Sequence, residues 1–151
     1  FIPSSLKSIR NSLAEIGKKT RIDSIKEVSL DFYKDERGDL TVAEEHSLPI
    51  KIARIFTVRA QQESNRANHA HKECSQLIFC VSGELVVVCD DSFKKSTLIL
   101  NNPSDGILVP PGIWLEQTYK KNNSILNVIC DLSYDPDDYI SDYKEFEAFK
   151  L

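Results

Sequence analysis

Methionine is absent from the 151 residues, and the sequence begins with Phe1. We therefore expect either that the numbering omits the start of the protein or that this is one domain of a longer chain. Long apolar runs are also missing, since no segment approaches the roughly 20 residues of a membrane-spanning helix. No signal peptide is recognisable either. These absences predict a cytoplasmic protein without a membrane partner.

None of the four cysteines stands in a Cys-x-x-Cys pair, which argues against zinc-ribbon and thioredoxin-like sites. Cys80 and Cys89 lie in apolar runs and are predicted to be small core residues. Free thiols suit a reducing compartment such as the cytoplasm. A strongly basic character is missing too, because the net charge is −4. A nucleic-acid partner is therefore not expected, although a few local cations could still bind a small anion.

One segment near the start has helical periodicity. Its apolar residues recur at helical spacing: Leu6, Ile9, Leu13 and Ile16. The pattern predicts a helix over 4–19 with Ser4 or Ser5 as its N-cap. The apolar stripe is narrow, so this is either a docking helix or a linker helix. Residues 1–22 are accordingly interpreted as an N-terminal helical extension or linker.

From about residue 22 the pattern changes to short strand-like segments separated by turn residues. We expect strands near 25–32, 39–44, 50–59, 76–81, 83–90, 94–100, 106–109 and 124–132. Spacings of about ten residues predict an all-β domain over 23–151, with sheets that close around one small ligand. The acidic, aromatic tail after Asp135 predicts a short C-terminal helix.

Two of the three histidines, His69 and His71, stand two residues apart, so on a strand they share one face. Gln76 and Gly83 follow them, and Gly106 precedes the turn 110–112. This spacing resembles the two sequence motifs of the cupins. The resemblance implies a cupin jelly-roll barrel, to which the helical periodicity adds a short helix near either end.

The residue types at the cupin ligand positions argue against a metal. A typical cupin site has three histidines and one carboxylate, but Gln76 and Leu115 stand at two of these four places. Two imidazoles and an amide are a poor ligand set for zinc or iron. We therefore expect no metal and no cofactor, and histidines free to transfer protons. The third histidine, His46, has no such context and is predicted to be a surface or loop residue.

More than four fifths of the chain resembles the sugar 3,4-ketoisomerases that act on dTDP-4-keto-6-deoxyglucose, also known as WxcM-like C-terminal domains. The resemblance rests on residues 37–40 with Glu44, 52–56, 66–72, Gln76, 90–91, 110–114 and the tyrosine-rich tail 138–146. It implies a metal-free jelly-roll homodimer with a dTDP-linked sugar as substrate. It also implies a place in deoxysugar and lipopolysaccharide biosynthesis.

The resemblance assigns His69 and His71 as the acid/base pair. One base would remove the proton on C3, an enediolate would form, and C4 would be reprotonated. Arg66 would face the diphosphate or the developing oxyanion. The other residues predicted to bind substrate are Arg54, Arg59, Lys72, Gln76 and Trp114. Trp114 is either a platform for the nucleotide base or a core residue.

Other functions are also compatible with the sequence. Leu115 favours a non-catalytic sugar-nucleotide binder that kept the site and lost turnover. A metal-dependent cupin such as a dioxygenase fits the ligand residues less well. A cupin sugar epimerase uses similar histidine chemistry, but its motif spacing is less similar. The N-terminal helix lies outside the family pattern, which suggests a domain fused to an acyltransferase.

Overall fold

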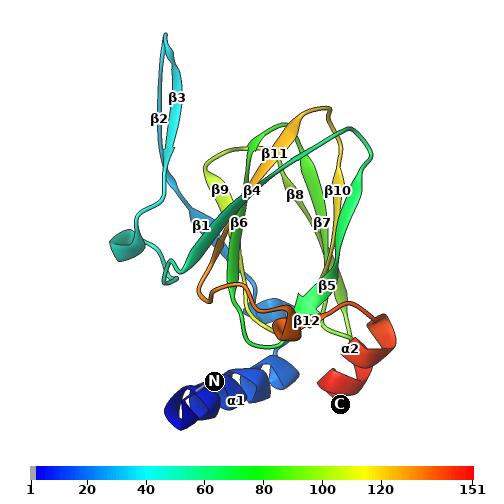
Figure 1. The fold of residues 1–151 in the computed structure, drawn as a ribbon. Coiled ribbons are helices and arrows are strands. Elements are labelled where there is room, and N and C mark those ends of the chain that lie inside the picture. Colours follow the sequence, from blue (N-terminus) through cyan, green and yellow to red (C-terminus); the bar gives the residue numbers. More distant parts are fainter. Residues whose placement is uncertain (1–2) are drawn as a thin grey trace.

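The computed structural model describes residues 3–151, which form two five-stranded antiparallel sheets, a hairpin and a helix near each end (Figure 1). The first sheet has the order β1 (Lys26–Ser29), β9 (Asp105–Val109), β6 (Gln76–Ser82), β11 (Ser124–Cys130) and β4 (Arg54–Ala60). The second has the order β12 (Tyr139–Ile140), β5 (Asn65–His71), β10 (Trp114–Tyr119), β7 (Leu85–Asp90) and β8 (Lys95–Leu100). The remaining elements are α1 (Ser4–Lys19), α2 (Tyr143–Lys150), the hairpin strands β2 (Asp31–Asp35) and β3 (Gly38–Val42), and three 3-10 turns at Ile22–Ser24, Glu45–Ser47 and Pro136–Asp138.

Alternation along the strands builds the core between the sheets. In β11 the inward residues are Leu126, Val128 and Cys130, which join one buried cluster with residues of β6, β7 and β10. Cys80 and Cys89 belong to this cluster and are at most 1% exposed, so the prediction that they are core residues is confirmed. The all-β fold is confirmed as well.

The predicted closure into a barrel is wrong. Within residues 3–151 no ladder of hydrogen bonds joins the edge strands of one sheet to those of the other. The domain is therefore an open jelly-roll sandwich, held together by side-chain packing between the inner faces.

The outer face of the first sheet is also covered. A second apolar cluster places Leu30 and Ile50 against Leu77, Phe79 and Ile129. The β2–β3 hairpin, in contrast, extends away from the sandwich (Figure 1). Its Tyr33 and Leu40 are each about 60% exposed, at 62% and 58%.

The lysine before the last residue ties the two ends of the chain together. Lys150 is 3% exposed, and its ammonium donates to the backbone carbonyls of Gly17, Thr20 and Gly112 over 2.5–2.9 Å. Three acceptors satisfy all three N–H groups of a buried ammonium. The end of α1, the Pro-Pro-Gly turn and α2 are thereby held at one point.

Two glycines allow α1 to approach so closely. A Cβ on Gly17 would lie 2.7 Å from the carbonyl oxygen of Lys72, and a Cβ on Gly112 would clash with the backbone of Gly17. Gly112 also has φ of 84°, a conformation that favours glycine. Arg10 adds ion pairs from α1 to Glu73 and Asp135. Of the two predicted roles, α1 has the contacts of a docking helix.

Local predictions differ in their success. The helix over 4–19 is confirmed, but its N-cap is Pro3, without a side-chain hydrogen bond. The predicted strand 25–32 is split, and β10 and β12 lie outside the predicted strands. The strand that the spacing of His69 and His71 assumes is confirmed as β5. In β10 the inward residue Gln117 is polar, which breaks the apolar alternation that would reveal a strand. His46 lies in an exposed 3-10 turn, as predicted. No helix within residues 3–151 is long and apolar enough to span a membrane.

Candidate active site

A β-bulge in β5 sets the direction of the predicted site residues. In the ladder with β10, His69 pairs with Leu115 and Ala67 pairs with Glu116, so Asn68 is the extra residue. Ala67 and Asn68 have φ values of 69° and 58°, in the left-handed region. Such a bulge reverses the alternation of side chains along the strand.

Because of the bulge, Arg66 shares the inner face with His69 and His71, although strict alternation would place it on the opposite face. Arg66 pairs with Gln117, whose buried amide contacts the hydroxyl of Tyr119. Burial raises the pKa of Tyr119 to about 12, and the charge of Arg66 opposes this shift. Arg66 itself is exposed, at the far end of β5 from His71.

His71 is held by a carboxylate from the C-terminal segment. Its Nδ1 lies 2.8 Å from Oδ2 of Asp138, and both side chains are nearly buried. The other oxygen, Oδ1, accepts from the backbone N–H of Glu73 at 2.7 Å. A carboxylate acceptor fixes the Nδ1–H tautomer, so the Nε2 lone pair of His71 is free. Within the described chain, buried Nε2 has no hydrogen-bond partner.

His69 is oriented in the same way by a backbone carbonyl. Its Nδ1 lies 3.0 Å from the oxygen of Ala67, which can only accept, so Nδ1 carries the proton. Burial, with a smaller contribution from His71, lowers the pKa of His69 to about 4. The ring centroids of His69 and His71 are 5.3 Å apart. The inner face therefore carries two imidazoles with free Nε2 atoms, and His69 is neutral at pH 7.

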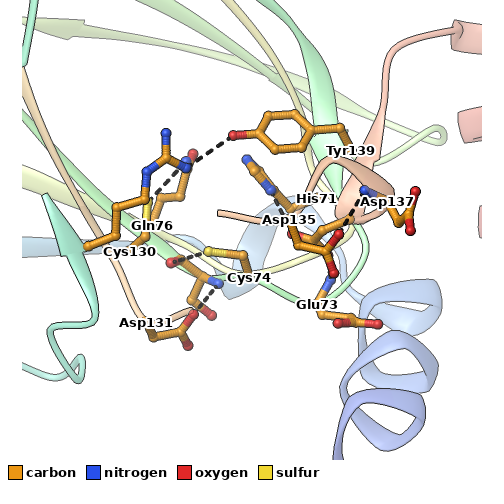
Figure 2. A network of polar contacts seen from close by, with 12 residues as sticks. His71, Glu73, Cys74, Gln76, Cys130, Asp131, Asp135, Asp137 and Tyr139 are labelled. Atoms are coloured by element: carbon orange, nitrogen blue, oxygen red, sulfur yellow. Dashed lines mark hydrogen bonds and ion pairs between the residues drawn. The ribbon is translucent and has the colours of Figure 1, made fainter. Parts of the chain in front are cut away.

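Tyr139 completes the histidine pair. It pairs with His71 in the β12–β5 ladder, and its ring centroid lies 4.4 Å from His71 and 5.0 Å from His69. Its hydroxyl accepts from Nη1 of Arg54 at 3.3 Å (Figure 2). The guanidinium of Arg54 also lies over the ring of Tyr134, 5.0 Å from the centroid. An arginine is thus fixed by aromatic groups beside the two imidazoles.

Three further residues with polar or sulfur-bearing side chains lie near His71: Gln76, Cys74 and Cys130 (Figure 2). Gln76 is buried, and its Nε2 donates to Sγ of Cys130 at 3.6 Å. Cys74 interacts with Cys130 closely enough that the pKa of Cys130 falls to about 6, helped by the Gln76 amide and the charge of Arg54. The same interaction raises the pKa of Cys74.

Not all predicted site residues are brought together. His69, His71, Arg54 and Gln76 lie together at one end of the space between the sheets. Arg66 is on the same inner face of β5 but is exposed at the far end of the strand. Arg59 is exposed on the outer face of β4, because Phe56 and Val58 take the inward positions. Trp114 packs with Ala70, Ile140 and Phe146 under α2. Of its two predicted roles, this is the environment of a core residue. Lys72 follows β5, and its backbone N–H donates to the backbone carbonyl of Asp138.

Sequence reasoning gave no site role to Asp138, Tyr139 or Cys74. Asp138 and Tyr139 were noted only as part of the tyrosine-rich tail, and they lie 67 and 68 positions after His71 in the chain. The local sequence feature that marks them is an aspartate followed by a tyrosine beside the turn after Asp135. Nothing local in the sequence connects it to β5.

The cupin metal position does not fit a metal ion in this chain. Leu115 lies directly opposite His69 at one ligand place, and it is 3% exposed in the apolar cluster. The Gln76 amide at another place directs its N–H at a sulfur. Two imidazoles without an anionic oxygen or sulfur ligand leave a divalent cation poorly coordinated.

Two facing sheets with a His-x-His strand on an inner face define a cupin-like protein. The same fold occurs in the solved structure of a sugar 3,4-ketoisomerase from Thermoanaerobacterium thermosaccharolyticum, with a TM-score of 0.80 and 24% identity over 85% of this chain and 95% of the other. A 3,4-ketoisomerase from Helicobacter canadensis has a TM-score of 0.78 and 29% identity, covering 83% of this chain and 96% of the other.

The family is defined by sequence as well. A family model described as "FdtA: WxcM-like, C-terminal" matches residues 18–150. The TDP-4-oxo-6-deoxy-alpha-D-glucose-3,4-oxoisomerase of Aneurinibacillus thermoaerophilus is 31% identical over 117 residues, which are 76% of this chain and 84% of that enzyme. The chain therefore belongs to the WxcM-like family of sugar 3,4-ketoisomerases.

Proposed function

We propose that this protein interconverts the 4-keto and 3-keto forms of a dTDP-linked 6-deoxyhexose by metal-free histidine catalysis. One observation carries the proposal: two imidazoles, 5.3 Å apart, present free Nε2 atoms on the inner face of a chain of this family. The substrate class follows the named activity of the 31% identical relative.

His69 is the stronger candidate for the base. Its neutral ring can take the proton from C3 of the sugar, beside the C4 ketone, to give an enediolate. His71, held by Asp138, would take the proton from O3 and deliver it to O4, which returns the ring to its starting state. Return of a proton to C4 gives the 3-ketone, so no electron leaves or enters the substrate. Asp138 positions His71 as a carboxylate positions the histidine of a catalytic triad.

Arginines supply the charge that this chemistry needs. Arg54, fixed by Tyr139 and Tyr134, lies beside the imidazoles and suits the developing enediolate oxygen. Arg66, exposed farther along β5, suits the diphosphate. The exposed arginine of β4, Arg59, faces away from both and has no assigned part.

The decisive experiment is NMR in deuterated buffer with dTDP-4-keto-6-deoxyglucose. The wild-type protein should produce a 3-keto sugar with deuterium at C4, and the couplings of the product give its C4 configuration. His69→Asn and His71→Asn should each lose this conversion. His46→Asn, at an exposed position, is the matched control and should keep it. Full conversion by either site variant would refute the assigned acid/base pair.

A non-catalytic binder is the second candidate, and Leu115 is the observation that favours it. This apolar side chain stands directly across the ladder from His69, where other cupins have a histidine. Binding of the dTDP-sugar without any deuterium incorporation would support the binder and exclude the isomerase.

We also propose a homodimer, supported by the β2–β3 hairpin. A two-stranded ribbon with exposed Tyr33 and Leu40 is marginal on its own and gains from a second apolar surface. Light scattering coupled to gel filtration should give twice the mass of the chain. Tyr33→Asp with Leu40→Asp should shift the protein to the monomer mass, and a wild-type protein that runs as a monomer would exclude the dimer.

A further inference from the structure

Three buried side chains of different chemistry, those of His71, Cys74 and Asp138, meet beside the end of β5. A ring nitrogen of His71, the sulfur of Cys74 and a carboxylate oxygen of Asp138 all lie within 4.8 Å of one another. Each residue is between 4% and 6% exposed. They come from the end of β5, the loop before β6 and the Pro136–Asp138 turn. Nitrogen, sulfur and oxygen donors therefore converge from three parts of the chain.

This donor set is the one that zinc prefers. Imidazole nitrogen, thiolate and carboxylate are its usual protein ligands, and thiolate selects against magnesium and calcium. The cluster also differs from the cupin metal position. Its donors besides His71 are the sulfur of Cys74 and the carboxylate of Asp138, whereas the cupin position has Gln76 and Leu115. The thiol of Cys74 also interacts with the thiol of Cys130.

We propose that His71, Cys74 and Asp138 form a binding site for a thiophilic divalent cation, with Zn²⁺ as the best match, and that its occupation inhibits the enzyme. Binding rests on the convergence of donors alone. Inhibition rests in addition on the proposed function.

The chemistry of binding explains the inhibition. The Nδ1–H of His71 now points at Asp138. An ion between these two groups takes the Nδ1 lone pair, so the ring proton must move to Nε2. Cys74 releases its thiol proton to solvent, and no electron is transferred. A ring with metal on Nδ1 and a proton on Nε2 cannot accept a further proton, so His71 can no longer shuttle one.

A surface pocket reaches one member of the cluster, Asp138. A pocket of about 300 Å³ is lined by Asp138 and Asp135, together with residues of α1. Arg10 also lines it, but its charge is balanced by Asp135 and Glu73. A cation can therefore approach Asp138 without crossing the space between the sheets.

The test is a titration of metal-free protein with ZnCl₂ and, separately, with CoCl₂. We expect one ion per chain by calorimetry and a sulfur-to-cobalt charge-transfer band in the ultraviolet spectrum. Cys74→Ser should lose the band and weaken Zn²⁺ binding at least about tenfold, as loss of ligand-shell groups does. Cys74→Ala provides a second variant in case the serine is poorly tolerated. The matched control is Cys80→Ser, a buried thiol that bonds only a backbone carbonyl.

Activity is measured on the same samples. Zn²⁺ should inhibit the wild type and the control, and Cys74→Ser should keep its turnover in the presence of Zn²⁺. No binding, a cobalt complex without a sulfur band, or equal Zn²⁺ affinity in Cys74→Ser would overturn the site. Binding with the sulfur band but no isomerase activity in any sample would refute the proposed function and leave the cation site standing.

Discussion

The two ends of the space between the sheets differ in how their buried side chains are stabilised. At one end, which we call the histidine end, His71, Gln76 and Cys130 are buried with polar partners. At the other, which we call the apolar end, Leu85 and Leu126 are fully buried and contact only the core. Burial of apolar side chains at the second end favours folding, whereas the proposed acid/base groups lie at the first.

Cysteines show what the difference means for a side chain. Cys89 lies among apolar residues, and burial raises its pKa to about 12, so it is an inert core residue. Cys130 is equally buried, yet its pKa falls to about 6 because of Cys74, Gln76 and Arg54. Burial alone therefore does not set the pKa of a thiol, because neighbouring groups shift it as well.

The largest effect should follow from a change at the histidine end. Asp138→Asn keeps an oxygen for the N–H of Glu73 but directs an amide N–H at Nδ1 of His71. The imidazole would then carry its proton on Nε2, and turnover should fall by a factor of about 10³ or more. Steady-state kinetics measures this loss. Asp135→Asn, on the same turn, is the control and should stay within a few-fold of wild type.

A change at the apolar end should lower the stability of the protein but leave its turnover number nearly unchanged. Leu126→Ala should cost about 2–5 kcal/mol of unfolding free energy, because it removes a buried side chain from a packed cluster. The turnover number of the folded protein should remain close to that of the wild type. Urea unfolding and kinetics separate the two effects. Loss of turnover equal to that of Asp138→Asn would mean that the two ends are not independent.

The bulge in β5 offers a smaller test, with a gain in stability. Ala67 has φ of 69°, which is strained for a residue with a Cβ. Ala67→Gly should raise the unfolding free energy by about 1 kcal/mol, net of the flexibility of glycine. Thermal unfolding measures the gain. Since asparagine tolerates this conformation better, Asn68→Gly should gain less, and an equal gain would contradict the strain at Ala67.

The smallest effect concerns pH. His69 has a pKa of about 4 in the folded protein, below the usual value near 6.5. The neutral ring, which is the base, is present above pH 4 and lost as the pH falls through it. Activity should therefore stay nearly constant from pH 8 to pH 5 and halve near pH 4. Circular dichroism at each pH confirms folding; a decline centred near pH 6.5 would contradict the assignment of His69 as base.

The histidine end was predictable from the sequence only where its residues are close together in the chain. Two-residue spacing places His69 and His71 on one face, and the cupin spacing adds Gln76. Asp138 could not be found this way, since a distant turn returns to β5 only through tertiary packing. The bulge that turns Arg66 inward has no clear local signal, because Ala67 and Asn68 are not glycines.

The outward direction of Arg59 follows from the alternation of side chains along β4. Arg54, Phe56 and Val58 occupy alternate positions, so Arg59 had to face outward on the same strand. The closed barrel was a generalisation from the fold class, and local patterns do not report whether edge strands bond. The apolar end, in contrast, follows directly from alternation, since its core residues recur at every second position.

The ammonium of Lys150 has a consequence for the order of folding. It joins residues near positions 17 and 20 to position 150, so this contact spans almost the whole chain. During synthesis on the ribosome, α1 emerges before Lys150 and cannot be fixed in place until that residue has emerged as well. Contacts of such high sequence separation form late and slowly. Until then the Pro-Pro-Gly turn lacks its cover, and the nascent chain exposes the surface on which α1 finally rests.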